Sequence, residues 1–197
     1  MFRSDYWTIV LTAAIYILAA ASGVMNFESI NNLLIWLLIA YMAALLVYPY
    51  FKKYLFGRAI IFDFVGVVSA GTADDYYRGV IHERRGMRQL IQRLKRNYKV
   101  VLFTNNNWEA HEPFSRRLGL NTLFDFEFAS STIGMKKPDG QAYREICRRV
   151  GVSPKNAIMV DDAAENLTGA KQAGLQTIHF LSLEQCEKAL RDMGVRF

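Results

Sequence analysis

The sequence predicts an α/β domain with a Rossmann-like parallel sheet of about five strands flanked by helices, preceded by two transmembrane helices. Two apolar segments, at 6–25 and 31–50, each have the roughly 20 residues that a helix needs to cross a bilayer. From Arg58 onward, short strand patterns alternate with helical patterns, which is typical of parallel strands joined by right-handed crossovers. We therefore expect a transmembrane hairpin with its juxtamembrane linker at 1–57 and an α/β domain at 58–197.

The flanks of the two apolar segments predict their orientation. Neither segment contains a charged residue, and tyrosine or tryptophan lies at the outer end of each, where interfacial aromatic residues are expected. Arg3 precedes the pair and Lys52 and Lys53 follow it, whereas the linker 26–30 has no Lys or Arg. The positive-inside rule then places both the N- and C-termini in the cytoplasm, so we expect a multi-pass membrane protein with two spans.

Two other interpretations of these segments compete with a membrane hairpin. The first segment would be a cleaved signal peptide, but its length and the second segment that follows it argue against this. Alternatively, both segments would be buried helices of a soluble bundle. Such helices keep a polar stripe on one face, and neither segment shows one.

Charge and cysteine content separate the two parts further. Three of the 24 Lys and Arg residues and two of the 18 Asp and Glu residues precede Arg58, so the net charge of +6 lies mostly in the second part. The two cysteines, Cys147 and Cys186, fall in expected helices and have no metal-ligand spacing. This usage suits a reducing compartment and excludes a disulfide framework.

The second part predicts five strands and five helices in alternation. Glycines that follow the helical patterns stand where a left-handed helix cap is wanted. The expected strands are 59–63, 99–104, 126–129, 157–161 and 176–180, and the expected helices are 86–97, 108–118, 139–150, 164–173 and 183–193.

Polar residues stand where these strand patterns end. Asp63 follows the apolar run 59–62 and precedes a glycine turn, Thr104 ends the next strand pattern, and Asp161 and Asp162 follow a later one. Open α/β sheets bind their ligands outside the carboxyl ends of the strands. A strand-end aspartate alone is more often an ordinary turn residue, but several such ends together predict a site.

In order and spacing, four stretches resemble the four motifs of the haloacid dehalogenase (HAD) superfamily, over roughly residues 58–181. They are 60–68, 100–105, the Gly-Met-Lys-Lys-Pro segment at 134–138, and 158–166. The resemblance implies a hydrolase whose aspartate nucleophile forms an aspartyl phosphate, with Mg²⁺ as cofactor and a lysine that faces the transferring group. The candidate site residues it implies are Asp63 and Lys137 for catalysis, Thr104, Asn105 and Lys137 for phosphate binding, Asp63, Val65 (through its backbone carbonyl) and Asp162 for the metal, and Asp161 and Asn166 as supporting residues around them.

Each candidate also has a plain structural interpretation. Thr104 with Asn105, and Asp161 with Asp162, would cap the helices that follow them. Asn166 stands where many relatives carry another acid; it would bind Lys137 or a metal-bound water, or only pack. Lys136, by contrast, is interpreted as a solvated loop charge.

Val65 departs from the pattern of most phosphatases of the family, which carry an aspartate at this position as general acid and base. Valine cannot transfer a proton, and losing such a group typically costs about 10²–10⁴ in rate. Some relatives lack this aspartate, including a branch that resembles sugar-phosphate phosphatases and branches that cleave carbon–halogen or carbon–phosphorus bonds. We therefore expect a Mg²⁺-dependent phosphatase for a membrane-proximal phosphomonoester, of lipid or protein, with a catalytically degenerate membrane-tethered binding or scaffold module as the alternative.

The segments around the motifs predict an open site and a basic helix beside it. Residues 69–85 leave room for a flap but not for a separate lid domain, so we expect a capless domain that suits large or surface-bound substrates. The basic run either forms a solvated face or contacts anionic lipid; it has no interleaved aromatics, so no nucleic-acid partner is expected. The residues considered for lipid contact are Arg84, Arg85, Arg88, Arg93 and Arg96.

Overall fold

The computed structural model describes residues 35–41, 44 and 57–197. The chain divides into two compact units, Met1–Phe51 and Lys52–Phe197. The expected transmembrane hairpin lies almost wholly outside the described residues. Within the described part of the chain, no helix is both long enough and apolar enough to cross a bilayer. The hairpin and the domain boundary at 57/58 therefore stay predictions.

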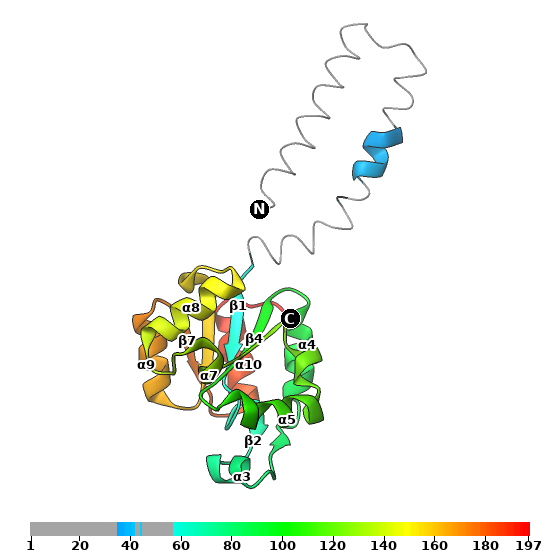
Figure 1. The fold of residues 1–197 in the computed structure, drawn as a ribbon. Coiled ribbons are helices and arrows are strands. Elements are labelled where there is room, and N and C mark those ends of the chain that lie inside the picture. The colour runs from blue at the N-terminus through cyan, green and yellow to red at the C-terminus, as the bar shows by residue number, and fades with distance from the viewer. Residues whose placement is uncertain (1–34, 42–43, 45–56) are drawn as a thin grey trace, which may run out of the picture. The chain divides into compact units, whose positions relative to one another are not determined.

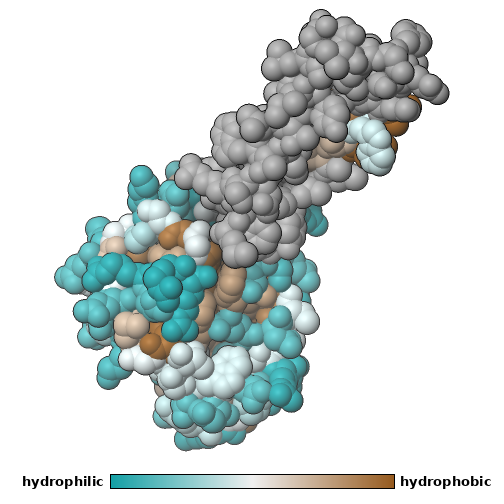
Figure 2. All heavy atoms as spheres, turned by 45° about the horizontal axis from the view of Figure 1, so that its top comes forward, coloured by the Kyte–Doolittle hydropathy of each residue, from teal (hydrophilic) through white to brown (hydrophobic). Residues whose placement is uncertain are grey.

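The described piece of the first unit, 35–41, is helical. Its coloured atoms in Figure 2 are brown or pale rather than teal. Its large apolar side chains are exposed in the structure, namely Ile35, Trp36, Leu38, Ile39 and Tyr41.

The second unit is built on a five-stranded parallel sheet with the strand order β5-β4-β1-β6-β7. This confirms the α/β fold class and all five expected strands. The strands are β1 (Ala59–Phe62), β4 (Lys99–Thr104), β5 (Phe126–Ala129), β6 (Ala157–Asp161) and β7 (Gln176–His179).

The five expected helices are also present, within a few residues of their predicted ends. They are α4 (Met87–Lys95), α5 (Trp108–Leu118), α8 (Gly140–Val150), α9 (Ala164–Gln172) and α10 (Leu183–Asp192). The shortest elements were not predicted, because two to five residues are too few to show a period. These are the antiparallel pair β2 (Ser69–Ala70) and β3 (His82–Glu83), the helices α3 (Ala73–Tyr77), α6 (Leu120–Leu123) and α7 (Ser130–Ile133), and a 3₁₀ turn at Pro154–Asn156.

Alternate residues of the central strands enter two separate cores, as the period of two in a strand requires. In β1, Ile60 and Phe62 pack on one face with side chains of α4 and α10, whereas Ala59 and Ile61 pack on the other face with side chains of α8 and α9. All four β1 side chains are fully buried. The sheet is therefore covered on both faces, as its continuous apolar strand patterns predict.

The topology places a ligand site at the carboxyl ends of β1 and β6. After β1 the chain continues through α4 to β4 on one side of β1, whereas after β6 it continues through α9 to β7 on the other side. Neighbouring strands whose connections leave in opposite directions form the switch point where open α/β sheets bind ligands. The chain enters this unit at the amino end of β1, and β2 and α3 lie beyond the opposite, carboxyl end (Figure 1).

Candidate active site

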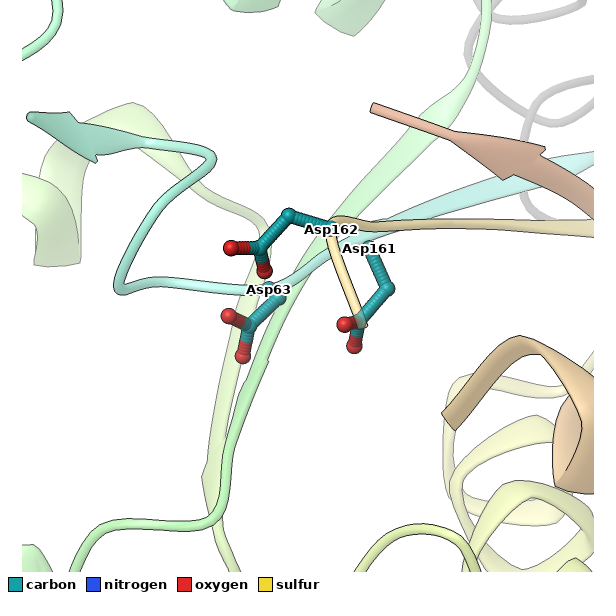
Figure 3. Close-up of side chains that lie close together, drawn as sticks. All are labelled: Asp63, Asp161 and Asp162. Atoms are coloured by element: carbon teal, nitrogen blue, oxygen red, sulfur yellow. The ribbon is translucent and has the colours of Figure 1, made fainter. Parts of the chain in front are cut away.

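Three carboxylates converge at the carboxyl ends of β1 and β6. Phe62 pairs with Val160, so the next residues of the two strands, Asp63 and Asp161, stand at the same level. Carboxylate oxygens of Asp63, Asp161 and Asp162 all lie within 4.8 Å of one another, and Figure 3 shows the three side chains gathered at this point. Asp63 and Asp161 are buried, whereas Asp162 is exposed.

Lys137 supplies the positive charge of this cluster. Its Nζ atom donates to Oδ1 of Asp63 at 2.5 Å and to Oδ2 of Asp161 at 2.7 Å. The side chain is about 1% exposed, so both ion pairs are shielded from solvent. The structure thus brings together the candidate nucleophile and the candidate lysine, which are 74 residues apart in the sequence.

Asp161 connects several residues of the site. Besides Lys137, it accepts hydrogen bonds from Nδ2 of Asn166, at 3.0 and 3.1 Å, and from the backbone N–H of Ala163 at 2.9 Å. The Asn166 amide therefore binds this carboxylate, and Tyr143 donates to the Asn166 carbonyl at 2.6 Å. Asp161 is thus the second carboxylate that pairs with Lys137.

Asn105 holds the lysine from the backbone side. Its Oδ1 accepts from the backbone N–H of Lys137 at 2.8 Å, and its Nδ2 donates to the Lys137 carbonyl at 2.9 Å. The Asn105 side chain is thereby engaged with Lys137, while its predicted contact with phosphate stays a prediction. Thr104 is buried at the end of β4, and its hydroxyl accepts from the backbone N–H of Asn106 at 3.2 Å.

Burial and charge act in opposite directions on the ionisable groups of the cluster. Burial raises the pKa of Asp63 to about 6. The negative charge of Asp161 also raises this pKa, whereas the positive charge of Lys137 lowers it. Burial by itself lowers the pKa of Lys137, but the two carboxylates outweigh it, and the pKa lies above its ordinary value. Burial also raises the pKa of Asp162, and this rise is opposed by Lys137 and Arg84.

The turn after the nucleophile lies against Asp162. Val65 is half-buried and packs on the core face that contains Phe62. Gly66 has a φ of +86°, and a Cβ atom at this position would lie 2.2 Å from Oδ2 of Asp162. The sharp turn and the close approach of the carboxylate both require glycine.

The donor set fits a hard divalent cation. Three carboxylates and one ammonium leave two net negative charges when all are ionised, and only Asp162 of the four groups is exposed to solvent. Carboxylate and carbonyl oxygens are the ligands that Mg²⁺ prefers. Asp63 and Asp162, with the backbone of Val65 in the intervening turn, are the residues that would hold it.

Sequence reasoning missed three contacts around the site. Gly169 of α9 approaches the chain so closely that a Cβ atom would lie 1.8 Å from the Pro138 carbonyl oxygen; a glycine inside a helical pattern was the available signal. His179 contributes Nε2 at 2.9 Å from the Asp162 carbonyl. Arg84 donates to the turn at 66–67, and no sequence signal indicates this.

The basic run expected to meet lipid is partly occupied within the domain. Arg84 donates to backbone carbonyls of the turn, Arg88 donates to Glu83 and to the Leu118 carbonyl, and Arg93 pairs with Glu187. Arg85 is exposed. Lipid contact by this run stays a prediction.

Fold and site together define a Rossmann-like α/β domain with a cluster of three carboxylates and one lysine at its switch point. Residues 51–174 match the haloacid dehalogenase-like hydrolase family. The chain belongs to this family, which confirms the resemblance seen in the motifs.

Curated relatives of the chain include several hydrolases of phosphate compounds. The chain is 30% identical over 112 residues to a flavin mononucleotide hydrolase of Arabidopsis thaliana, which covers 56% of this chain and 45% of that protein. It is 38% identical over 73 residues to a sesquiterpene phosphatase of Aspergillus oryzae, covering 36% and 37% of the two chains. A glyceraldehyde 3-phosphate phosphatase of Pyrococcus furiosus is 30% identical over 102 residues, covering 51% and 42%. The matches span less than half of each relative.

Solved structures share the fold. A HAD-like hydrolase of Porphyromonas gingivalis superposes with a TM-score of 0.58 at 17% identity, covering 72% of this chain and 99% of that one. A HAD family enzyme of Bacteroides thetaiotaomicron, in complex with magnesium and inorganic phosphate, gives a TM-score of 0.55 at 14% identity, covering 62% and 93%.

Proposed function

We propose that this chain is a magnesium-dependent phosphatase that acts through an aspartyl phosphate on a phosphomonoester close to a membrane. The observation that carries this proposal is the buried Asp63–Lys137–Asp161 arrangement at the switch point, with Asp162 beside it. It joins a carboxylate nucleophile to a fixed ammonium and to oxygen ligands for a cation. The hydrolases of phosphate compounds among the relatives support the same chemistry.

In the proposed reaction, the Asp63 carboxylate attacks phosphorus while the bond from phosphorus to the leaving oxygen breaks. Mg²⁺, when bound, screens the negative charges of nucleophile and phosphate from each other. Lys137 and the Thr104 hydroxyl hold the phosphate oxygens as charge moves toward the leaving group. Water then attacks the aspartyl phosphate, releasing phosphate and restoring Asp63. Because Val65 carries no proton, the leaving oxygen takes one from solvent.

The elements between β1 and β4 suit a capless domain with an open site. They comprise the pair β2–β3, the short helix α3 and the helix α4. Arg117 of α5 binds the flap formed by residues 69–85, because it donates to the carbonyls of Gly79 and Ile81 at 3.2 and 2.9 Å. An open site exposes the aspartyl phosphate to water and admits a phosphate carried on a large molecule.

The membrane part of the proposal rests on the sequence. Two spans and cytoplasmic termini come from the sequence of the first unit, and a contact with anionic lipid comes from the basic run of the second unit. The exposed apolar side chains of 35–41 support it. Labelling of single cysteines placed at residues 2 and 28 tests it, because a membrane-impermeant reagent should reach the two positions from opposite sides.

A second candidate is a catalytically degenerate, membrane-tethered binding module. Val65 is the observation that favours it, because the position that usually transfers the proton packs instead against the core. Such a module would bind phosphorylated groups at Lys137 and Thr104 without turning them over.

An assay of the full chain with Mg²⁺ on a panel of phosphopeptides, phospholipids and small phosphomonoesters separates the two candidates. We expect turnover on one of these substrate classes that is lost in Asp63→Asn. Turnover by Val65→Asp but not by the unaltered chain would establish the binding module. Silence of both, with retained phosphate binding, would refute the phosphatase proposal.

A further inference from the structure

Arg84 binds three consecutive carbonyls of the turn that follows the nucleophile. Its Nη2 donates to the Gly66 carbonyl at 2.6 Å, its Nε donates to the Val67 carbonyl at 3.0 Å, and its backbone N–H donates to the Val68 carbonyl at 2.9 Å. The side chain is half-buried. Arg84, in the segment between β3 and α4, therefore holds residues 66–68 of the turn, while Ser69 closes it by donating to the Phe64 carbonyl.

The same guanidinium also contacts Phe180, the residue that follows β7. It lies over the Phe180 ring, 5.0 Å from the ring centroid. The backbone N–H of Phe180 donates to the Asp161 carbonyl at 2.9 Å. Gly66, which Arg84 binds, packs directly against the Asp162 carboxylate. Arg84 thus joins the segments that follow β1, β6 and β7.

We propose that Arg84 is a positioning residue, whose fork of donors holds the turn at 65–68 where the Val65 carbonyl can bind the metal ion beside Asp63 and Asp162. Because the side chain of Val65 is apolar, the turn can offer the metal only backbone oxygen. Backbone placement then decides the ligand geometry, and Mg²⁺ demands near-ideal geometry. This inference rests on the magnesium dependence proposed above.

Positioning and charge predict opposite effects at this residue. Arg84 is a fixed positive charge near a cation site, so through charge alone its removal would tighten Mg²⁺ binding. Through positioning, its removal weakens binding, since residues that orient metal ligands typically contribute about 10–100-fold in affinity. Lysine keeps the charge but lacks the planar fork that reaches two carbonyls, so it does not replace arginine here.

The test measures Mg²⁺ affinity of the full chain in detergent by titration calorimetry. We expect Arg84→Met and Arg84→Lys each to bind Mg²⁺ about 10–100-fold more weakly. Arg116→Met is the matched control, because the Arg116 side chain is exposed and pairs with Glu112 on the surface of α5; the Mg²⁺ affinity of this variant should be unchanged. Equal or tighter binding by Arg84→Met, or full recovery in Arg84→Lys, would overturn the proposal.

Hydrogen exchange without metal gives an independent readout. In Arg84→Met we expect faster exchange at the amides of 64–69 and unchanged exchange in α8; unchanged exchange at 64–69 would also overturn the proposal. A chain that binds Mg²⁺ but hydrolyses no phosphoester would refute the proposed function and leave the role of Arg84 intact. A chain that binds no Mg²⁺ would refute the magnesium dependence and the role of Arg84 together.

Discussion

Replacing Lys137 by methionine should destabilise the domain strongly, and more at high pH than at low pH. The methionine side chain fills similar space but leaves Asp63 and Asp161 as buried carboxylates without their shared counter-ion. At the 2.5 and 2.7 Å separations of the two ion pairs, an effective dielectric constant of about 20 gives an attraction of about 6 kcal/mol each. Desolvation offsets much of this, and removing one partner of a buried pair typically costs about 3–5 kcal/mol.

The pH dependence follows from the same geometry. Without the ammonium, the pKa of Asp63 rises further above the value of about 6 that burial already gives it. Protonation then neutralises the carboxylate, so Lys137→Met regains stability as the pH falls from 8 to 5. With about 2–4 °C per kcal/mol for a domain of this size, the midpoint should fall by roughly 6–20 °C at pH 8 and by less at pH 5.

Differential scanning fluorimetry of the full chain measures this shift. Lys136→Met is the matched control, because Lys136 is the preceding residue and is exposed; its midpoint should move by less than about 2 °C. A midpoint of Lys137→Met within this range at pH 8, or a loss that does not shrink toward pH 5, would refute the assignment of Lys137 as the counter-ion of both carboxylates.

Two further predictions concern the nucleophile and the lysine loop. The pKa of Asp63 is raised from 3.8 to about 6. In metal-free protein this group therefore contributes about 3 kcal/mol to the free energy of unfolding below pH 3.8, and the contribution is lost as the pH rises through 6. The melting midpoint of the unaltered chain should fall relative to that of Asp63→Asn between pH 4 and 7, and parallel curves of midpoint against pH would contradict this. Gly169→Ala should destabilise the domain in thermal melts, although alanine favours a helix by about 1 kcal/mol, because its Cβ would meet the Pro138 carbonyl oxygen at 1.8 Å. Gly140→Ala is the control in α8, where the nearest heavy atoms lie at 3.5 Å, and equal gains in stability at both glycines would contradict the predicted steric conflict.

Residues at strand ends were predictable, whereas contacts between the segments beyond the strands were not. The apolar runs indicate the strands because a strand buried on both faces tolerates few polar side chains, and the first polar residue of each run marks the carboxyl edge of the sheet. Asp63 and Asp161 stand at such strand ends, and their carboxylates lie close together. The two hydrogen bonds between Asn105 and Lys137, and those from Arg84 to the turn at 66–68, depend on how loops fold over the carboxyl edge of the sheet. The hydrophobic periodicity of the sequence carries no information on the path of these loops.

The contacts of Lys137 bear on how the proposed phosphatase would bind its substrate. Two of the three N–H donors of the ammonium group are directed to Asp63 and Asp161. In the proposed reaction the third donor would bind a phosphate oxygen while both ion pairs persist. The two hydrogen bonds of Asn105 hold the lysine backbone in place, so the ammonium would need no reorganisation as charge moves to the phosphate. Electrostatic stabilisation is most effective under this condition.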